Sequence, residues 1–424
     1  MDTLDTEIIQ PVGINPLKAS LFKVLLLATI TNWQSRLLHL ISHTEYLNME
    51  KIEMVDLKGQ YRKIKAEVDA AVANVIETTA FINGPDVKGF AAELGSYLNV
   101  KHVIPCANGT DALQIAMMAL DLQPGDEVIT PSFTYAATCE VIALLKLTPV
   151  FVDTDPDSFG FDLAEVEKAI TPKTKAVVPV HLYGQCADME PLLKLAAKHN
   201  LFVIEDVAQA LGAEYTFSDG TVKKAGTMGI IGTTSFFPSK NLGCYGDGGA
   251  IFTHDDNLGT VLRQVANHGQ TRLYYHDLVG VNSRLDTMQA AILRCKLPHL
   301  DEYALARNKA ADYYDQAFVS NDKIKTPFRA SYSNHVFHQY TITLAEGVNR
   351  DGLGKFLDEK GVPNKVYYPV PQHLQVAYNL KGYKEGDLPV AEDLSHRVIS
   401  LPMHTELTED QLKYITETVL EFVK

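Results

Sequence analysis

Apolar residues recur at helical spacing along the first part of the chain that has a globular character. They predict one amphipathic helix from Leu57 to about Val75 and a second from Val87 to Tyr97. Short apolar runs then alternate with helical stretches, and runs of this length are typical of buried strands. We expect strands at 103–106, 127–130, 149–152, 176–180, 201–204, 233–235 and 250–253.

This alternation predicts an α/β fold with a mainly parallel sheet covered by helices on both faces. After about Asp301 the pattern changes, with helices expected from Asp301 to Tyr314, near 352–360 and from Glu409 onward. Strands are expected at 338–344 and 366–368. We therefore expect a large domain over residues 49–300 and a smaller C-terminal α+β domain over residues 301–424.

The first 48 residues differ from the rest. The apolar run Leu21–Ile30 is too short to span a bilayer, and Lys23 interrupts it. The run would make a poor signal-peptide core, because no small-x-small cleavage pattern follows closely. A clean globular sequence begins at Met49, which favours an upstream translation start. We expect residues 1–48 to be a dispensable extension.

Composition narrows the function classes. The chain has 424 residues, 46% of them hydrophobic, which is ample for a large core. Its net charge of −14 argues against binding nucleic acid or an anionic membrane. The five cysteines form no CxxC pair and no metal pattern, so we expect reduced thiols, a cytoplasmic protein and no metal site.

The most informative segment for chemistry surrounds Lys240, which lies between two phenylalanines and a Gly-rich run ending at Gly249. Upstream, the apolar run 201–204 leads directly to Asp206. A desolvated lysine has a lowered pKa and is nucleophilic. A lysine that forms a Schiff base, with a carboxylate for a ring nitrogen, is what pyridoxal 5′-phosphate (PLP) requires. The alternative for Asp206 is a structural ion pair or hydrogen bond.

Other polar residues would complete a PLP site around such a lysine. Gly109 and Thr110 lie between a strand and a helix start, where backbone N–H groups bind phosphate well, although a simple N-cap is the alternative. Ser235 is able to hydrogen-bond the same phosphate. Tyr135 follows a strand end and would stack on the cofactor ring, unless it belongs to the core. Gln209 would donate to the ring's phenolic oxygen.

Two further segments stay open on residue chemistry alone. Arg284 is either a surface ion pair with Asp286 or a fork for a substrate carboxylate such as that of glutamate. Tyr367 and Tyr368 begin a stiff Pro-containing loop that would present hydroxyls to a sugar.

From about Ile52 to its C-terminus the chain resembles the DegT/DnrJ-type PLP-dependent nucleotide-sugar aminotransferases, which have the aspartate aminotransferase-like fold type I. The motifs that carry this resemblance, in order, are Cys106–Leu113, Gly125–Tyr135, Tyr183–Gln185, Glu205–Gln209, Ser235–Lys240 and Asn282–Asp286.

The resemblance implies specific roles. Lys240 would form the Schiff base with the cofactor aldehyde, Asp206 would hold the pyridinium proton and Gln209 would contact the ring hydroxyl. The implied stacking and phosphate residues are Tyr135, Ser235, Gly109 and Thr110. Asn282 matches an asparagine that, in this family, reaches the phosphate of the partner subunit, which makes a homodimer the catalytic unit. Arg284, Tyr367 and Tyr368 fall where relatives bind substrate.

Within the family the chain looks most similar to UDP-2-acetamido-2-deoxy-3-oxo-glucuronate aminotransferases of bacterial surface-polysaccharide (O-antigen) synthesis, with L-glutamate as donor and 2-oxoglutarate as product. Alternatives are a dTDP-3-keto-6-deoxyhexose aminotransferase and a non-catalytic regulatory relative. A sugar 3-dehydrase would have His in place of Lys240. Two departures stand out: Tyr367 occupies a position where that group has His, and residues 216–224 form a longer loop.

Overall fold

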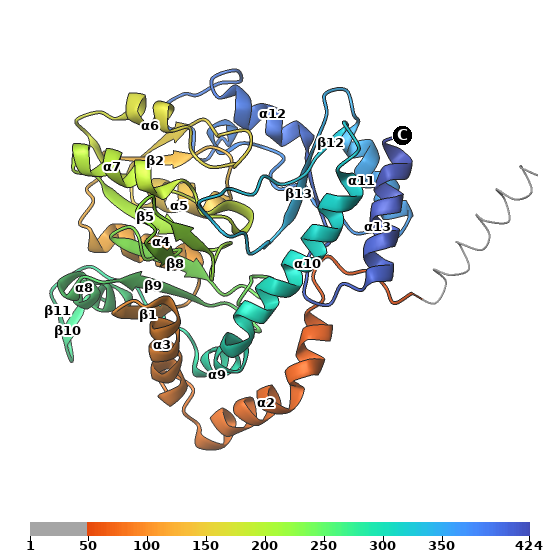
Figure 1. The fold of residues 1–424 in the computed structure, drawn as a ribbon. Helices are drawn as coiled ribbons and strands as arrows, with labels where there is room; N and C mark the ends of the chain where they lie inside the picture. The colour runs from red at the N-terminus through yellow and green to blue at the C-terminus, as the bar shows by residue number, and fades with distance from the viewer. Residues whose placement is uncertain (1–48) are drawn as a thin grey trace, which may run out of the picture. The chain divides into compact units, whose positions relative to one another are not determined.

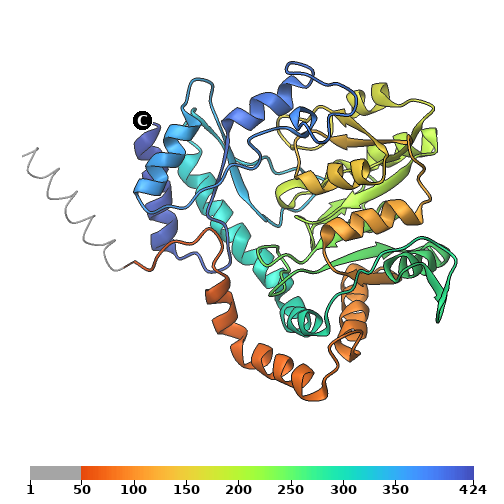
Figure 2. The ribbon, with the colours of Figure 1, turned by 180° about the vertical axis from the view of Figure 1, so that it is seen from behind.

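The computed structural model describes residues 49–424, and the extension 1–48 lies outside the described residues. Residues Ile52–Lys424 form one compact unit, seen from two sides in Figures 1 and 2. No helix within residues 49–424 is long and apolar enough to cross a membrane. The boundary expected between residues 300 and 301 stays a prediction.

The centre of this unit is a seven-stranded sheet in the order β1-β9-β8-β5-β4-β2-β3. Strands β8, β5, β4, β2 and β3 are parallel neighbours, whereas β9 is antiparallel to both β1 and β8. The expectation of a mainly parallel sheet is confirmed. The strands are β1 (His102–Cys106), β2 (Glu127–Pro131), β3 (Thr148–Val152), β4 (Thr174–Val177), β5 (Phe202–Asp206), β8 (Ile231–Ser235) and β9 (Gly249–Thr253).

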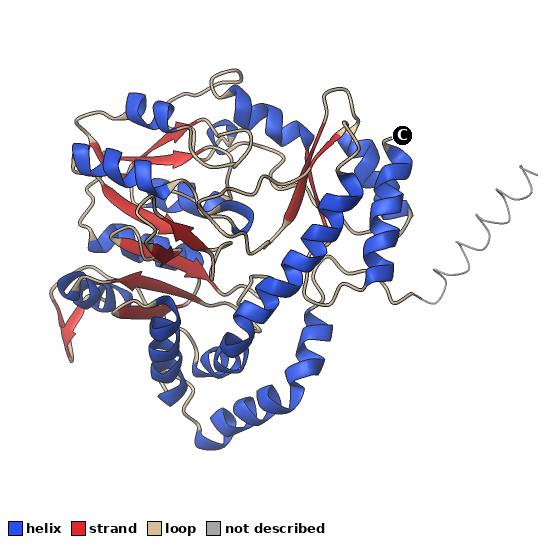
Figure 3. Ribbon diagram, viewed as in Figure 1, coloured by secondary structure: helices blue, strands red, loops and turns tan. Residues whose placement is uncertain are grey.

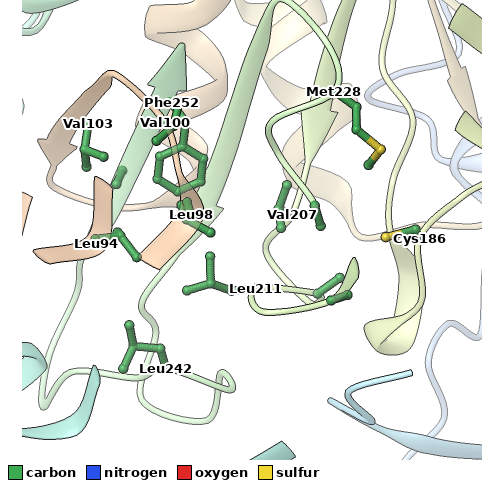
Figure 4. Close-up of a cluster of buried hydrophobic side chains, with 14 of the residues drawn as sticks. Leu94, Leu98, Val100, Val103, Cys186, Val207, Leu211, Met228, Leu242 and Phe252 are labelled. Carbon is green, nitrogen blue, oxygen red and sulfur yellow. The ribbon is translucent and has the colours of Figure 1, made fainter. Parts of the chain in front are cut away.

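Helices cover both faces of this sheet, as Figure 3 shows. In strand β5, successive residues enter different apolar clusters, because side chains alternate across a strand. Val203 packs in the cluster of α3 and α7, part of which appears in Figure 4, and Ile204 packs in the cluster of α4, α5 and α8. The helices are α3 (Pro85–Leu98), α4 (Gly109–Ala119), α5 (Ala136–Leu144), α6 (Leu163–Ala169), α7 (Met189–His199), α8 (Asp256–Ala266) and α9 (Thr287–Lys296).

The C-terminal part is built on a smaller antiparallel sheet, β12-β13-β14. The long helix α10 leads into it, and α11 and α13 pack beside it (Figure 1). These elements are α10 (Leu300–Phe318), β12 (Ile324–Lys325), β13 (Tyr340–Leu344), α11 (Arg350–Glu359), α12 (Pro389–Arg397), β14 (Val398–Leu401) and α13 (Glu409–Phe422). Helix α13 begins with a capping box between Thr408 and Gln411.

Two expectations for this part are corrected. The strand predicted at 366–368 is wrong: that segment is loop, tied to the sheet only by the bridge between Lys365 and Ser400. The third strand is instead β14, which the pattern did not predict. Strand β13 begins at Tyr340, so His338 and Gln339 lie in the loop before it.

The long segment 216–224 is a surface hairpin formed by β6 (Glu214–Thr216) and β7 (Val222–Lys224).

Helix α2 (Leu57–Thr78) packs against α9 and is capped by Asp56, whose side chain accepts a hydrogen bond from the Gly59 amide. The segment before it crosses to the C-terminal part. There the Met403 amide donates to the Met54 carbonyl at 3.3 Å. Met54 and Met403, which are far apart in sequence, thereby both line the cavity described next.

Candidate active site

A cavity of about 680 Å³ lies at the carboxyl ends of β5 and β8, beside the first turn of α4. Ligands of open α/β sheets bind at this edge. Chain segments that are distant in sequence bring nine of the predicted site residues to the cavity wall: Gly109, Thr110, Tyr135, Asp206, Gln209, Ser235, Lys240, Tyr367 and Tyr368.

Two consecutive carboxylates end strand β5, and they have different environments. Glu205 is fully buried and accepts hydrogen bonds from the backbone amides of Gly226, Met228 and Gly229 and from His181 Nε2. These bonds satisfy it within the protein, so its role is structural. Asp206 lines the cavity on the opposite face of the strand.

Asp206 is fixed by two neighbours. Its carboxylate accepts a hydrogen bond of 2.8 Å from the Thr138 hydroxyl and one of 3.1 Å from the Ala208 amide. A carboxylate has about four acceptor positions, so Asp206 keeps capacity for a donor placed in the cavity. The protein therefore presents an oriented carboxylate to the cavity, as the sequence predicts.

Lys240 lies in the loop after β8 and is partly buried at the cavity wall. Burial lowers the pKa of its amine to about 8, and the negative charge of Asp206 opposes that shift. An amine with this pKa is partly deprotonated near neutral pH and is able to act as a nucleophile. The loop is tight, because a Cβ on Gly243 would lie 2.3 Å from the Pro238 carbonyl oxygen.

The first turn of α4 forms a cradle with Ser235. Asn108 caps the helix by accepting a hydrogen bond from the Asp111 amide, which leaves the amides of Gly109 and Thr110 outside that cap. A Cβ on Gly109 would lie 2.7 Å from the Ser235 Cβ, so only glycine fits the observed approach. A helix N-terminus beside a hydroxyl group favours a phosphate.

Gln209 connects two tyrosines, Tyr183 and Tyr368, through its side-chain amide. Its Nε2 donates to the Tyr368 hydroxyl at 3.0 Å, and its Oε1 accepts from the Tyr183 amide at 2.9 Å. One N–H of the amide remains for a ligand. Tyr135 is 59% exposed, and its ring lies 6.1 Å from that of Tyr368.

Two predicted residues lie outside this cavity. Asn282 is exposed and pairs with Asn267 through a backbone bridge. Arg284 lines a different hollow, of about 430 Å³, between α3 and α8, and it makes no ion pair with Asp286 in the described chain. Between them Ser283 is buried and donates to Asp111 at 2.6 Å. The chain does not bring Asn282 or Arg284 to its own cavity.

Sequence reasoning missed several residues that line the cavity or, like Thr138, support a residue that lines it. Thr138 follows Tyr135 by three positions, a spacing that places both near one helix start, and this was the available signal. His338 and Gln339 form a polar pair directly before an apolar strand. No local pattern marks others, among them Met54, Val55, Asp247 and Met403.

The residues present fit PLP. The cavity offers an amine of lowered pKa for an aldehyde, a fixed carboxylate for a ring nitrogen and a glycine cradle for a phosphate. Its volume is within the usual range for a site that holds a small molecule. When bound, PLP would be held by Lys240, by Asp206 and by the first turn of α4 with Ser235.

Comparison with known proteins agrees with this fit. The model of the DegT/DnrJ/EryC1/StrS aminotransferase family matches residues 62–420. The chain is 47% identical over 375 residues to a pleiotropic regulatory protein of Geobacillus stearothermophilus, covering 88% of this chain and 99% of that protein. It is also 47% identical over 364 residues to the UDP-2-acetamido-2-deoxy-3-oxo-D-glucuronate aminotransferase of Pseudomonas aeruginosa, covering 86% and 98%. A third relative, the dTDP-3-amino-3,4,6-trideoxy-alpha-D-glucose transaminase of Streptomyces venezuelae, is 40% identical and covers 88% and 97%.

Solved structures lead to the same family. A DegT/DnrJ/EryC1/StrS aminotransferase from Brucella abortus has a TM-score of 0.82 at 41% identity, covering 88% of this chain and 99% of that one. NtdA from Bacillus subtilis, solved with bound cofactor PMP, has a TM-score of 0.80 at 29% identity, covering 89% and 86%. The expected cofactor and fold type I are confirmed. The chain belongs to the DegT/DnrJ/EryC1/StrS aminotransferase family and is a PLP-dependent aminotransferase.

Proposed function

We propose that this enzyme moves the amino group of L-glutamate to C3 of a nucleotide-linked keto sugar, for surface-polysaccharide synthesis. The favoured acceptor is UDP-2-acetamido-2-deoxy-3-oxo-glucuronate. One observation carries the aminotransferase chemistry: a single cavity holds Lys240, whose pKa is lowered to about 8, and the fixed carboxylate of Asp206. The identity of 47% to an aminotransferase named for this acceptor supports the sugar.

The chemistry divides between cofactor and chain. PLP, when bound, withdraws electrons from the substrate carbon that loses its proton. Lys240 Nζ takes that proton and returns one at the end of the transfer, which requires an amine that is able to lose and gain a proton near neutral pH. Asp206 would accept a hydrogen bond from the ring nitrogen, and Thr138 and the Ala208 amide hold its carboxylate in place.

Both substrates use the same cavity in turn. Glutamate delivers its amino group and leaves as 2-oxoglutarate, and the keto sugar then enters and accepts that group. Tyr367 and Tyr368 line the outer wall, where the sugar would lie. Their hydroxyls suit a sugar, because Tyr presents an apolar ring with a polar tip.

A homodimer supplies what one chain lacks. Lys240 is the one Lys or Arg among the described residues that line the cavity, and Asp111, Asp206 and Asp247 line it as well. The cofactor phosphate, glutamate and a nucleotide sugar are all anionic, so further cations are needed. Asn282 and Arg284, which do not line their own cavity, would enter the cavity of a second copy.

A second acceptor has specific support. The 40% identity to a transaminase named for a dTDP-linked trideoxyglucose favours a dTDP-3-keto-6-deoxyhexose. That sugar has no carboxylate, so Arg284 would then serve glutamate alone. The name of one relative at 47% identity, a pleiotropic regulatory protein, favours a non-catalytic regulatory role. The nucleophilic amine in the cavity favours catalysis.

A substrate panel tests the proposal. The purified enzyme is incubated with L-glutamate and with UDP- and dTDP-linked 3-keto and 4-keto sugars, and the products are identified by mass spectrometry and NMR. Amination of the UDP-linked 3-keto glucuronate at C3 supports the favoured acceptor. Preference for a dTDP-linked sugar supports the second one. A cofactor absorbance band that glutamate does not bleach would contradict any glutamate-dependent activity.

A further inference from the structure

His338 is a buried histidine at the cavity wall with no role in the chemistry described above. It is 7% exposed and comes from the C-terminal part, two residues before β13. Its Nδ1 is enclosed and has no hydrogen-bond partner in the described chain. The side chain nevertheless lines the cavity. Because Nδ1 has no accessible surface, Nε2, which is not enclosed, is the ring nitrogen that is able to donate to a ligand in the cavity.

The protein holds this histidine in place. The buried guanidinium of Arg307 donates to the carbonyl oxygens of Phe337 at 3.1 Å and of His338 at 3.4 Å. Behind the loop, a Cβ on Gly184 would lie 2.8 Å from the amide nitrogens of the same two residues. The His338 backbone is therefore fixed from two sides. An imidazole on a fixed backbone is suited to precise contact with a ligand.

The surroundings of the ring are electropositive. Burial lowers the pKa of His338 well below its usual value, and the positive charges of Lys240 and Arg307 lower it further. The imidazole is therefore neutral at physiological pH and carries one N–H that is able to donate. Arg307 is 2% exposed and has no carboxylate partner among residues 49–424. Two cationic groups beside a neutral donor favour an anionic ligand.

We propose that His338 is a substrate-binding residue that donates a hydrogen bond to the carboxylate on the reacting carbon of the amino donor. This inference rests on the proposed function. The reacting carbon of glutamate must lie at the Lys240 amine, and its α-carboxylate is one bond away. C3 of a keto sugar carries no carboxylate. His338 therefore acts in the amino-acid half of the reaction and not in the sugar half.

The test separates these two halves. In His338→Leu, the KM for L-glutamate in the first half-reaction rises about 10- to 100-fold, the amount expected for a lost hydrogen bond to a charged group. The second half-reaction, from the aminated enzyme to the keto sugar, stays within about twofold. His338→Gln, which keeps an N–H donor, recovers part of the glutamate affinity. His404→Leu removes a buried histidine that is absent from the cavity wall and leaves both KM values unchanged.

A binding measurement adds a readout other than turnover. Calorimetric titration of the PLP-loaded enzyme with 2-oxoglutarate, which this form binds without reacting, shows a weaker affinity in His338→Leu by the same factor. An equal loss in both half-reactions, or an unchanged KM for glutamate, overturns the inference. If the wild-type enzyme itself does not react with glutamate, the proposed function has failed instead, and the variants are not needed to show it.

Discussion

The hydroxyl of Thr138 donates a hydrogen bond of 2.8 Å to the carboxylate of Asp206, and both side chains are buried. The two residues are 68 positions apart and come from the first turn of α5 and the end of β5. Thr138 is therefore the protein's own means of orienting the carboxylate that the cofactor ring requires.

Replacing Thr138 by valine keeps the shape and removes this hydrogen bond. Asp206 then loses a partner on the protein side, so we expect the free energy of unfolding of the apoprotein to fall by about 1–3 kcal/mol. The affinity for PLP should fall as well, because the carboxylate is less well oriented. Chemical unfolding and PLP titration measure the two effects.

Thr130→Val is the matched control. Thr130 is buried in β2, and its hydroxyl has no hydrogen-bond partner in the described chain. Removing that hydroxyl should leave stability unchanged or raise it. If both valine variants behave alike, the hydrogen bond to Asp206 contributes nothing.

Gly109→Ala tests the phosphate cradle. The new Cβ would lie 2.7 Å from the Ser235 Cβ, a distance that forces α4 and β8 apart. We expect the dissociation constant of PLP to rise at least about tenfold, since the amides of a helix N-terminus bind phosphate only at close range. Gly160→Ala, whose Cβ would lie no closer than 3.3 Å to a neighbour, is the control. Equal PLP affinity in both variants would contradict the cradle.

The pKa of Lys240 sets a pH dependence. Burial favours the neutral amine and lowers the pKa from the usual 10.5 to about 8, so the folded protein releases a proton that the unfolded chain keeps between these values. Stability from this group therefore rises with pH across that window. The rate at which apoprotein captures PLP should rise about tenfold per pH unit below 8 and level off above it.

Asp206→Asn provides the check on this profile. The negative charge of Asp206 opposes the lowering, so its removal should move the plateau of the capture rate to lower pH. The rate is followed through the absorbance of the bound cofactor. A capture rate that keeps rising tenfold per pH unit through pH 9, with no plateau in the wild-type protein, would mean that the Lys240 amine is not desolvated.

Mixing two inactive variants tests the shared site. Lys240→Ala has an intact Arg284, and Arg284→Ala has an intact Lys240. If Arg284 serves the partner's cavity, a mixed dimer contains one complete site, and activity returns when the proteins are unfolded and refolded together. If Arg284 acts in its own chain, every site stays defective and the mixture is inactive. Asn282→Ala in place of Arg284→Ala extends the test to the phosphate.

The sequence was sufficient for residues whose role depends on local context. Asp206 ends an apolar strand and Lys240 lies in a Gly-rich turn, so strand and turn patterns located both. The spacing of Thr138 from Tyr135 places it near the helix start, but its hydrogen bond to Asp206 was not predictable, because the two residues are distant in sequence and only the sheet order brings them together. His338 escaped notice for a related reason, since its meaning depends on a buried cation from α10 and on a cavity wall made by several segments.

The small sheet shows where the prediction of strands from sequence fails. The apolar run 366–368 is loop, whereas the run 398–401, which is one residue longer, is β14. Both have strand-like composition, and only pairing with β13 separates them.

The most direct test of the account is to locate the lysine that holds PLP. The holoenzyme is reduced with borohydride and digested, and the modified peptide is sequenced by mass spectrometry. We expect the pyridoxyl phosphate group on Lys240. Lys296 is a suitable internal comparison, because burial also lowers its pKa to about 8 while it lies outside the cavity wall. Modification of Lys296 or of any other lysine, with Lys240 left free, would contradict the account.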